Sequence, residues 1–315
     1  MTMNTKTPRV SVIIATYDRP LLVRRAVQSV IDQTFGEWEL LVVDDRGNPE
    51  TETVVKTFAS KDGRVHYVPN ETRLGLMENK NKGVRLSSPA SEYVAFLDDD
   101  DALLPRFLER TIAVMDSDPR LMAANTGVEL RTQEGKLIKL ADTVPDNDHF
   151  WKVRLGTGSV IRKTIFTKFN IWYDKDMKFE DWDFGIRVAK DHPWIAIPDV
   201  LWVYYRYHAK MGESMSTVYT KATPQSVLDA LYRKYESVFR AAGPEAIALL
   251  HRVTGKMLLR ADHVKAGRWH LWRSFCELPS ISSFCYWLLS IIAPSAFKNL
   301  TLIIWKNRIK GMLKA

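Results

Sequence analysis

The chain has 315 residues, of which 46% are hydrophobic and 11% aromatic, a composition that supports a substantial core and excludes a disordered or fibrous protein. Its two cysteines form no CxxC pair and no secretory signal precedes Pro8, so we expect a cytosolic chain without disulfides. The formal charge of +8 comes from the C-terminal end, where residues 252–315 hold 11 Lys and Arg against 2 Asp and Glu, and we therefore expect no nucleic-acid partner.

Strand and helix patterns alternate over the first 120 residues. A β-rich run at 10–15 precedes a helical pattern that opens at Pro20, and Asp18 is the expected cap of that helix. The alternation continues to a helix that opens at Pro105. The expected strands are 38–43, 65–68 and 93–97, and the expected helices are 50–59 and 76–86. This order predicts a mostly parallel sheet with helices on both faces.

Polar residues follow three of these strands, at the sheet edge where open α/β proteins bind ligands. They are residues 16–18, 44–45 and the four consecutive aspartates 98–101. Four carboxylates held together repel one another unless a cation lies among them, and the alternative is a solvated acidic loop. No GxGxxG and no GKS or GKT loop is present, so a nucleoside diphosphate bound here would need Mg²⁺ or Mn²⁺ to neutralise it.

A second acidic cluster, at residues 179–187, mixes carboxylates with aromatic residues. Partial burial there would raise the pKa of a carboxyl group toward that of a useful general base. If the segment is a helix, Glu180, Asp183 and Arg187 share one face, so the alternative is a surface helix held by ion pairs.

Together the two clusters resemble the family 2 glycosyltransferases of the GT-A fold, over roughly residues 8–215. The matching segments are 12–20 (VIIATYDRP), 41–45 (LVVDD), Gly75 with Asn81 and Gly83, 96–101 (FLDDDD) and 180–183 (EDWD). The resemblance implies an inverting transfer of a sugar from a nucleoside diphosphate sugar, with a preference for UDP. Processive members carry QxxRW before several transmembrane helices, and the absence of that arrangement here favours addition of a single sugar.

The resemblance also implies roles for individual residues. The sugar donor's nucleotide would contact Thr16, Tyr17, Asp18, Arg19, Asp45, Asn81, Asp98 and Asp99. Asp100 would bind the metal, and Asp181 would deprotonate the acceptor hydroxyl. His208 is a second candidate ligand, although a lone histidine near aromatic residues is more often structural. The residues expected to support the acceptor site are Glu180, Trp182, Arg187 and Gly158, although Gly158 could equally mark a plain turn.

The C-terminal region differs from the rest in composition. We expect a catalytic domain at 1–220 and a helical, basic, amphipathic region at 221–315, in which the apolar run 284–294 is too short to span a bilayer. Tryptophans beside basic residues favour attachment to anionic lipid at the inner face of the cell membrane, and the acceptor would then be a lipid-linked glycan. The alternative is that these helices pack on the main domain or on a second copy in a homo-oligomer.

Two other functions stay open from the sequence. A metal-dependent nucleotidyl or phosphoryl transferase would need phosphate-binding Lys or Arg residues near Asp98, and the sequence does not identify them. A non-catalytic subunit that binds a nucleotide sugar or a divalent ion is the second alternative.

Overall fold

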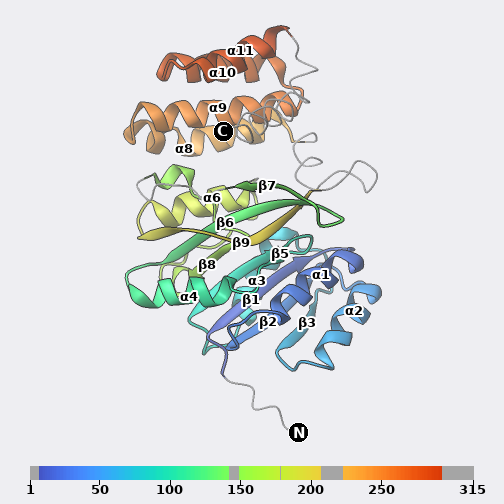
Figure 1. Cartoon of the computed structure of the whole chain (residues 1–315). Coiled ribbons are helices and arrows are strands. Elements are labelled where there is room, and N and C mark those ends of the chain that lie inside the picture. Colours follow the sequence, from blue (N-terminus) through green and yellow to red (C-terminus); the bar gives the residue numbers. More distant parts are fainter. Residues whose placement is uncertain (1–6, 142–148, 178, 207–222, 293–315) are drawn as a thin grey trace. The chain divides into compact units, whose positions relative to one another are not determined.

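The computed structural model describes residues 7–141, 149–177, 179–206 and 223–292 (Figure 1). The chain divides into two compact units, residues 1–206 and residues 207–315. The expected domain boundary near residue 220 lies between the described segments and stays a prediction.

The first unit is built on one mixed β-sheet. Four parallel strands form one half of it, in the order β3 (Val65–Pro69), β2 (Trp38–Asp44), β1 (Val10–Thr16) and β4 (Tyr93–Asp98). The sheet continues through β8 (Ser159–Arg162), β6 (Ala123–Thr132), β9 (Trp194–Arg206) and β5 (Ala102–Leu103), and β7 (Leu137–Ala141) pairs with β6. The first half confirms the predicted parallel α/β arrangement, whereas β8 runs antiparallel to both of its neighbours and makes the second half mixed.

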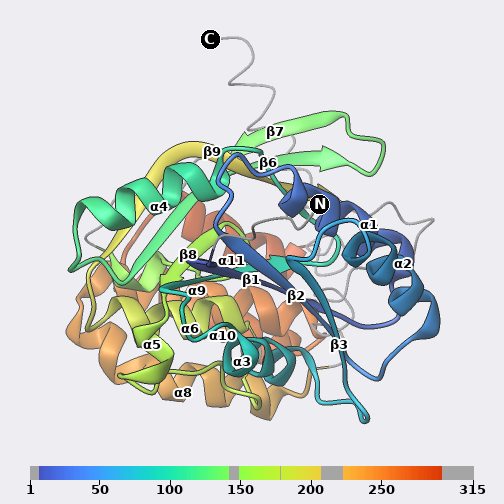
Figure 2. The same ribbon diagram turned by 90° about the horizontal axis from the view of Figure 1, so that it is seen from below.

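Helices cover both faces of this sheet, as expected. One group is α1 (Pro20–Ile31), α2 (Pro49–Ala59) and α4 (Phe107–Ser117), and the other is α3 (Leu76–Leu86), α5 (Thr164–Thr167) and α6 (Glu180–Ala189). Figure 2 shows the first group above the strands and the second below them. Val12 and Ile14 enter the core on the first face and Ile13 enters the core on the second, because successive strand residues point in opposite directions. Gly83 lets α3 lie close to β1, since a Cβ there would be 2.5 Å from Ile13 Cγ2.

The cap predicted for α1 is wrong. Arg19 occupies the N-cap position and no side chain caps the helix. Asp18 has a positive φ of 54° and its Oδ1 accepts a hydrogen bond of 2.6 Å from Asn48 Nδ2. The left-handed turn therefore directs this carboxylate toward the start of α2 instead of toward the first turn of α1.

The second unit consists of four helices in its described part. They are α8 (Gln225–Ala241), α9 (Pro244–Arg260), α10 (Val264–Glu277) and α11 (Ile281–Ile292), each packed on the next. The helices α9 and α10 approach closely at two glycines, since a Cβ on Gly267 would lie 3.0 Å from the carbonyl oxygen of Gly255. Within the described segments, no helix is both long and apolar enough to cross a bilayer.

Candidate active site

The carboxyl ends of β1, β2 and β4 lie side by side. In the register of the sheet Thr16 is opposite Asp44, and Ala15 is opposite Asp98. The amide of Asp45 donates a 2.8 Å hydrogen bond to the carbonyl oxygen of Thr16, which ties the ends of β1 and β2 together. The three polar segments read from the sequence therefore meet at one edge of the sheet, because their strands are parallel neighbours.

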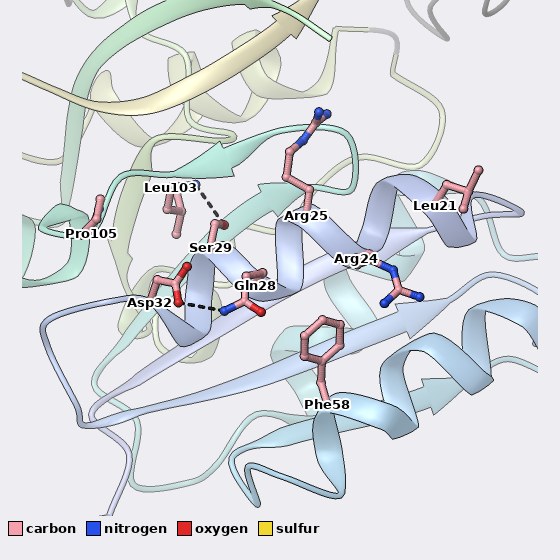
Figure 3. Close-up of a pocket in the computed structure, with 9 residues that line it drawn as sticks. All are labelled: Leu21, Arg24, Arg25, Gln28, Ser29, Asp32, Phe58, Leu103 and Pro105. Carbon is pink, nitrogen blue, oxygen red and sulfur yellow. Dashed lines mark hydrogen bonds between the residues drawn. The ribbon is translucent and has the colours of Figure 1, made fainter. Parts of the chain in front are cut away.

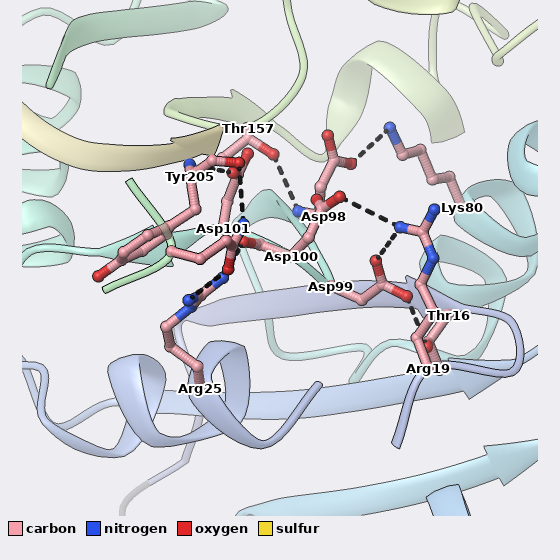
Figure 4. A network of polar contacts seen from close by, with 11 residues as sticks. Thr16, Arg19, Arg25, Lys80, Asp98, Asp99, Asp100, Asp101, Thr157 and Tyr205 are labelled. Atoms are coloured by element: carbon pink, nitrogen blue, oxygen red, sulfur yellow. Dashed lines mark hydrogen bonds and ion pairs between the residues drawn. The ribbon is translucent and has the colours of Figure 1, made fainter. Parts of the chain in front are cut away.

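The four aspartates that begin at the last residue of β4 alternate between accessible and buried positions (Figure 4). Asp99 is buried, where it accepts hydrogen bonds from Thr16 Oγ1 at 2.7 Å and from Arg19 Nη1 at 3.0 Å. Asp101 is also buried and accepts a 3.1 Å hydrogen bond from the amide of Tyr205. The side chains of Asp98 and Asp100 are 43% and 21% exposed. Two of the four acids thus fix the turn, and the other two are available to a ligand.

Burial and mutual repulsion weaken the acidity of this turn. Burial raises the pKa of Asp99 to about 7 against the opposing effect of Arg19. Burial also raises the pKa of Asp100, to which the charge of Asp98 contributes, and raises that of Asp101 well above its ordinary value. A bound cation would reverse these shifts, because it favours the ionised carboxylates.

The residues present fit a divalent metal only if a bound substrate supplies some of its ligands. Across the described segments, no three His, Cys, Asp or Glu side chains gather into a site made by the protein alone. Mg²⁺ and Mn²⁺ commonly take one or two carboxylates and complete their shell with water and substrate phosphates. The accessible carboxylate of Asp100 suits that arrangement. His208, the second candidate ligand, lies outside the described residues.

Three cationic side chains surround the acidic turn, and sequence reasoning did not identify them as a group. Arg19 Nη1 lies 3.1 Å from Asp100 Oδ2, and Arg25 donates to the carbonyl oxygen of Asp100 at 2.5 Å. Lys80 Nζ lies 3.3 Å from Asp98 Oδ1. Arg25 and Lys80 lie in the first halves of α1 and α3, and Arg19 immediately precedes α1. Helices that follow parallel strands start at the carboxyl edge of the sheet, so the topology predicted from the sequence could have located all three residues.

Asp45 closes the loop that follows β3. Its carboxylate is buried and accepts hydrogen bonds from the amides of Leu74 at 2.6 Å and Gly75 at 2.9 Å. Arg73, from the loop after β3, stacks over the ring of Tyr17 at 4.3 Å. Contact of Asp45 and Tyr17 with a nucleoside stays a prediction that this arrangement permits.

Asn81 connects α3 to the segment before α6. Its amide nitrogen donates to the carbonyl oxygen of Tyr173 at 2.9 Å, and its oxygen accepts from the amide of the same residue at 3.0 Å. The side chain is buried. This pair holds the backbone in place, and the expected contact between Asn81 and the nucleotide is left untested.

The second acidic cluster forms the start of α6. Asp181 accepts a 2.8 Å hydrogen bond from the amide of Trp182, and Arg154 Nη1 lies 3.6 Å from its other oxygen. Its side chain is 31% exposed, so it can meet a substrate. Glu180 lies 3.7 Å from Lys80 Nζ, and burial raises its pKa against the attraction of that ammonium.

Two of the expected supporting residues hold α6 to its surroundings. Asp183 is buried and pairs with Arg187 at 2.7 Å, and Arg187 also donates to the carbonyl oxygen of Trp172. Trp182 is buried, and its ring nitrogen donates to the carbonyl oxygen of Trp151 at 2.9 Å. Of the ion-paired surface face weighed from the sequence, only the pair of Asp183 with Arg187 is present, and its acid is buried, whereas Glu180 lies next to Lys80.

Gly158 lies in a turn that only glycine fits. Its φ is +82°, and a Cβ would fall 2.1 Å from the ring nitrogen of Trp202. The backbone of Gly156 is close to Asp181, since a Cβ added to Gly156 would lie 3.2 Å from the Cβ of Asp181. The turn therefore places backbone beside the acid expected to act as base, which is compatible with acceptor binding there.

Among the hollows on the described surface of the first unit, two bear on the position of the site. One, of about 560 Å³, lies on the outer side of α1 and contains none of the acids described above (Figure 3). It is lined by Leu21, Arg24, Arg25, Gln28, Ser29, Asp32, Phe58, Leu103 and Pro105. The other, of about 280 Å³, follows β3 and is lined in part by Asn70, which also contacts Asp45. The second hollow adjoins the polar edge of the sheet. The first hollow is larger, but it lacks the acids of the candidate site and is therefore not assigned as the active site.

Comparison with known families gives one assignment for the first unit. The family described as "Glycosyl transferase family 2" matches residues 11–179, which is more than half of the chain. The matched segment contains the polar edge of the sheet and ends at the residue before α6.

Curated relatives include proteins of known and unknown activity. An uncharacterized glycosyltransferase of Methanocaldococcus jannaschii is 26% identical over 209 residues, which are 62% of this chain and 70% of that protein. The GalNAc(5)-diNAcBac-PP-undecaprenol beta-1,3-glucosyltransferase of Campylobacter jejuni is 39% identical over 98 residues, but these are only 31% of either chain.

Solved structures share the fold. The mannosyltransferase PcManGT of Pyrobaculum calidifontis, in complex with GDP-Man and Mn²⁺, superposes with a TM-score of 0.57 at 17% identity, covering 95% of this chain and 84% of that one. S. aureus TarS in complex with UDP-GlcNAc gives 0.55 at 16% identity, covering 92% and 81%. These likenesses confirm the GT-A fold.

Proposed function

The chain belongs to glycosyl transferase family 2, and from that membership we propose that it moves one sugar, with inversion, from a nucleoside diphosphate sugar to a hydroxyl of a glycan acceptor. The observation that carries the proposal is the meeting of two acidic elements at one lysine. Lys80 Nζ lies 3.3 Å from Asp98 at the end of β4 and 3.7 Å from Glu180 at the start of α6. The proposed donor residue Asp98 and the proposed acceptor-side residue Glu180 therefore lie beside the same ammonium, which supports one shared site.

On the sugar-donor side, the proposed contacts follow the edge of the sheet. Tyr17 and Asp45 flank the loop where the base would lie, and the accessible carboxylate of Asp98 would accept from a ribose hydroxyl. Asp100 would hold Mg²⁺ or Mn²⁺, which when bound supplies positive charge to the diphosphate leaving group. A UDP-sugar is the donor we expect, by resemblance to the family.

On the acceptor side, Asp181 would act as general base. The acceptor oxygen forms a bond to the anomeric carbon as the bond from that carbon to the diphosphate oxygen breaks, and Asp181 takes the proton of the hydroxyl. Attack from the face opposite the leaving group inverts the configuration. The protein's contribution is to hold the two substrates in line at this edge.

We also propose that the acceptor is lipid-linked and that the second unit lies on anionic lipid at the inner face of the cell membrane. Rings of Trp272, Phe275, Phe284 and Trp287 contact one another across α10 and α11 at centroid distances between 4.9 and 5.8 Å. Apolar side chains of α11 are exposed beside them. They are Ile281, Phe284, Leu288, Ile291 and Ile292.

Charge complementarity supports lipid as the occupant of this face. The basic excess of the chain falls in residues 252–315, and aromatic rings beside cations suit the headgroup region of an anionic bilayer. The C. jejuni relative, by its name, acts on an undecaprenol-linked glycan, which supports an acceptor of the same kind here.

A nucleotide screen followed by product analysis tests the proposed reaction. Thermal stability would be measured with UDP, GDP, CDP and dTDP in the presence of Mn²⁺, because a ligand at 100 times its Kd adds about 2.7 kcal/mol to stability. The matching nucleotide sugar should then be hydrolysed slowly to the nucleoside diphosphate in the absence of acceptor. Release of a nucleoside monophosphate would instead indicate a nucleotidyl or phosphoryl transferase, and binding without turnover with any acceptor would indicate a non-catalytic subunit.

A further inference from the structure

Arg19 contacts two of the four aspartates of the acidic turn through a single nitrogen atom. Its Nη1 lies 3.0 Å from Asp99 Oδ1 and 3.1 Å from Asp100 Oδ2 (Figure 4). The side chains of Arg19 and Asp100 are 22% and 21% exposed, so the pair is partly shielded from water. The guanidinium therefore touches the same carboxylate that is proposed to hold the metal.

A metal ion and this guanidinium would compete for Asp100. Mg²⁺ binds carboxylate oxygens at about 2.0–2.1 Å, so it would lie close to a cation that is itself within hydrogen-bond distance of the same carboxylate. Two cations at one carboxylate repel each other. The guanidinium cannot lose its proton in a protein, so only its movement away from Asp100 would end the competition. In the arrangement that the structure shows, a metal should therefore bind weakly on its own.

Asp99 gives Arg19 a partner that it can keep when it releases Asp100. The other oxygen of Asp99 accepts a 2.7 Å hydrogen bond from Thr16 Oγ1, which holds this carboxylate without help from Arg19. A diphosphate bound at the same edge would offer new acceptors, and guanidinium groups form strong charge-assisted hydrogen bonds with phosphate oxygens. Arg19 could then exchange Asp100 for a phosphate while it remains paired with Asp99.

Other bonds hold the backbone of the acidic turn. The amide of Asp98 donates to Thr157 Oγ1 at 2.9 Å. Arg25 donates to the backbone carbonyl oxygen of Asp100 at 2.5 Å. These contacts do not involve Arg19, so its guanidinium can be removed while the position of the Asp100 backbone is maintained.

We propose that Arg19 makes metal binding at Asp100 depend on the nucleotide. Without nucleotide its guanidinium occupies the carboxylate of Asp100 and opposes the metal, and with nucleotide the diphosphate takes the guanidinium over and leaves Asp100 to the metal. The inference rests on the proposed glycosyltransferase function, from which the metal and the diphosphate are taken. It assigns Arg19 a role in the order of binding, in addition to the nucleotide contact expected from the sequence.

The first test is Mn²⁺ binding to the full chain without nucleotide, followed by the electron paramagnetic resonance signal of unbound Mn²⁺. Arg19→Met removes the guanidinium and keeps an apolar side chain of similar reach, so it should tighten Mn²⁺ binding about three- to tenfold. If Arg19 only supported the shape of the turn, its loss would weaken Mn²⁺ binding or leave it unchanged, and either result overturns the inference.

Two further variants identify the source of the gain. Arg24→Met removes the same charge from an exposed position of α1 that lines the hollow without acids, and it should leave Mn²⁺ affinity within about twofold of the wild type. Asp100→Ala combined with Arg19→Met should abolish the gain, because the contested carboxylate is gone. An equal gain in Arg24→Met, or a gain that persists without Asp100, would overturn the competition at this carboxylate.

The second test asks whether Arg19 releases Asp100 when a diphosphate binds. The ratio of UDP affinities in Mn²⁺ and in EDTA equals the factor by which UDP strengthens Mn²⁺ binding, because such coupling is reciprocal. Arg19→Met should lower this ratio at least about threefold, since the competitor is then absent before UDP binds. An unchanged ratio would show that Arg19 opposes the metal equally in both states, which overturns the proposed exchange.

The outcomes separate the role of Arg19 from the function beneath it. Turnover of a nucleotide sugar by the wild type, with no gain in Mn²⁺ affinity in Arg19→Met, overturns the role and leaves the function standing. A gain in a chain that turns over no nucleotide sugar supports the competition and contradicts the function. If Arg19→Met does not fold, Arg19→Gln decides, because its amide can still donate to Asp99, and no gain there overturns the inference.

Discussion

At the residue scale, the four consecutive aspartates 98–101 divide into two that are structural and two that are accessible. Asp99 and Asp101 point inward and hold the turn to β1 and β9, whereas Asp98 and Asp100 stay accessible. The sequence motif could not distinguish these roles, because alternation depends on how the turn leaves β4. The D-x-D spacing implied by the family resemblance nevertheless falls on the two accessible acids.

Substitution of Asp100 tests the metal. Asp100→Ala should abolish the stabilisation by nucleotide that depends on Mn²⁺, with the fold intact, because no phosphate loop replaces the lost metal contact. The measurement is the shift in Tm on adding the nucleotide with Mn²⁺ or with excess EDTA. Asp191→Ala, an exposed acid after α6, serves as control. Equal nucleotide affinity of the wild-type chain in EDTA would rule out metal dependence.

Substitution of Asp181 tests the base. Asp181→Asn keeps the shape of the side chain and removes its ability to take a proton, so kcat should fall about 10²–10⁴-fold. Binding of the nucleotide should change little, because Asp181 belongs to α6 and not to the strand ends proposed to hold the nucleotide. Steady-state kinetics and a parallel nucleotide titration separate the two effects. Retention of more than about a tenth of wild-type kcat would refute the assignment.

At the element scale, alternation of strands and helices was the feature best predicted from the sequence. Each strand and helix expected before residue 120 is present, because buried parallel strands and amphipathic helices leave distinct periodic patterns. The antiparallel strand β8 and the long-range pairing of β6 with β9 left no such pattern. The cap on α1 was wrong because the conformation of Asp18 depends on Asn48, 30 residues away.

The same limit applies to the site. The strand-end acids could be placed because topology alone brings them together, as at Thr16 and Asp98. The pairing of Lys80 with Glu180 joins residues 100 positions apart through the packing of α3 against the segment before α6. No short motif encodes that contact, and it required the structure.

The crossing of α9 and α10 depends on two facing glycines. A methyl group on Gly267 would lie 2.7 Å from Leu259 Cγ and 3.0 Å from the carbonyl oxygen of Gly255, and the backbone atom cannot move aside. Gly267→Ala should therefore destabilise the helical unit by about 1–2 kcal/mol, although alanine is the better helix former. Gly36→Ala, where no atom lies within 4 Å of the added carbon, is the matched control and should change the unfolding free energy by less than about 0.5 kcal/mol. Urea unfolding of the full chain, with the transition of each unit followed separately, measures both.

A buried histidine pair makes the helical unit sensitive to acid. His251 Nδ1 lies 2.9 Å from His270 Nδ1, and the hydroxyl of Tyr232 lies 3.2 Å from His251 Nε2. Burial lowers the pKa of His251 to about 3 and that of His270 to about 4. The unfolded chain therefore binds more protons below about pH 6.5, so the pair's contribution to stability is complete above that pH and is lost as pH falls toward 4 and 3.

Unfolding at several pH values checks this dependence. Between pH 6.5 and 4.5 the free energy of unfolding of the helical unit should fall by about 1.4 kcal/mol per pH unit for each histidine that protonates only on unfolding. The double variant His251→Leu with His270→Leu should lose most of that slope. An identical slope in the wild type and the double variant would show that other groups cause the acid sensitivity.

At the scale of the whole molecule, the acids of the candidate site and the basic excess lie in different parts of the chain. The acids of the candidate site belong to residues 1–206, and the basic excess belongs to residues 252–315. The basic excess therefore does not belong to the unit that would bind the nucleotide. It suits an enzyme whose acceptor is held at an anionic surface, which is the arrangement proposed here.

Binding to liposomes tests that arrangement. Each basic residue near an anionic bilayer contributes about 1 kcal/mol, and insertion of an isoleucine adds about 1.5–3 kcal/mol that salt does not screen. Binding should therefore require anionic lipid and be reversed only in part by high salt. Ile292→Glu, on an α11 residue that is 69% exposed, should weaken binding at least about tenfold because it loses the apolar term and adds repulsion. Ser237→Glu adds the same charge to the exposed side of α8 and should cause a much smaller loss. A chain that ignores anionic liposomes but forms a dimer disrupted by Ile292→Glu would identify this face as an interface between two copies instead.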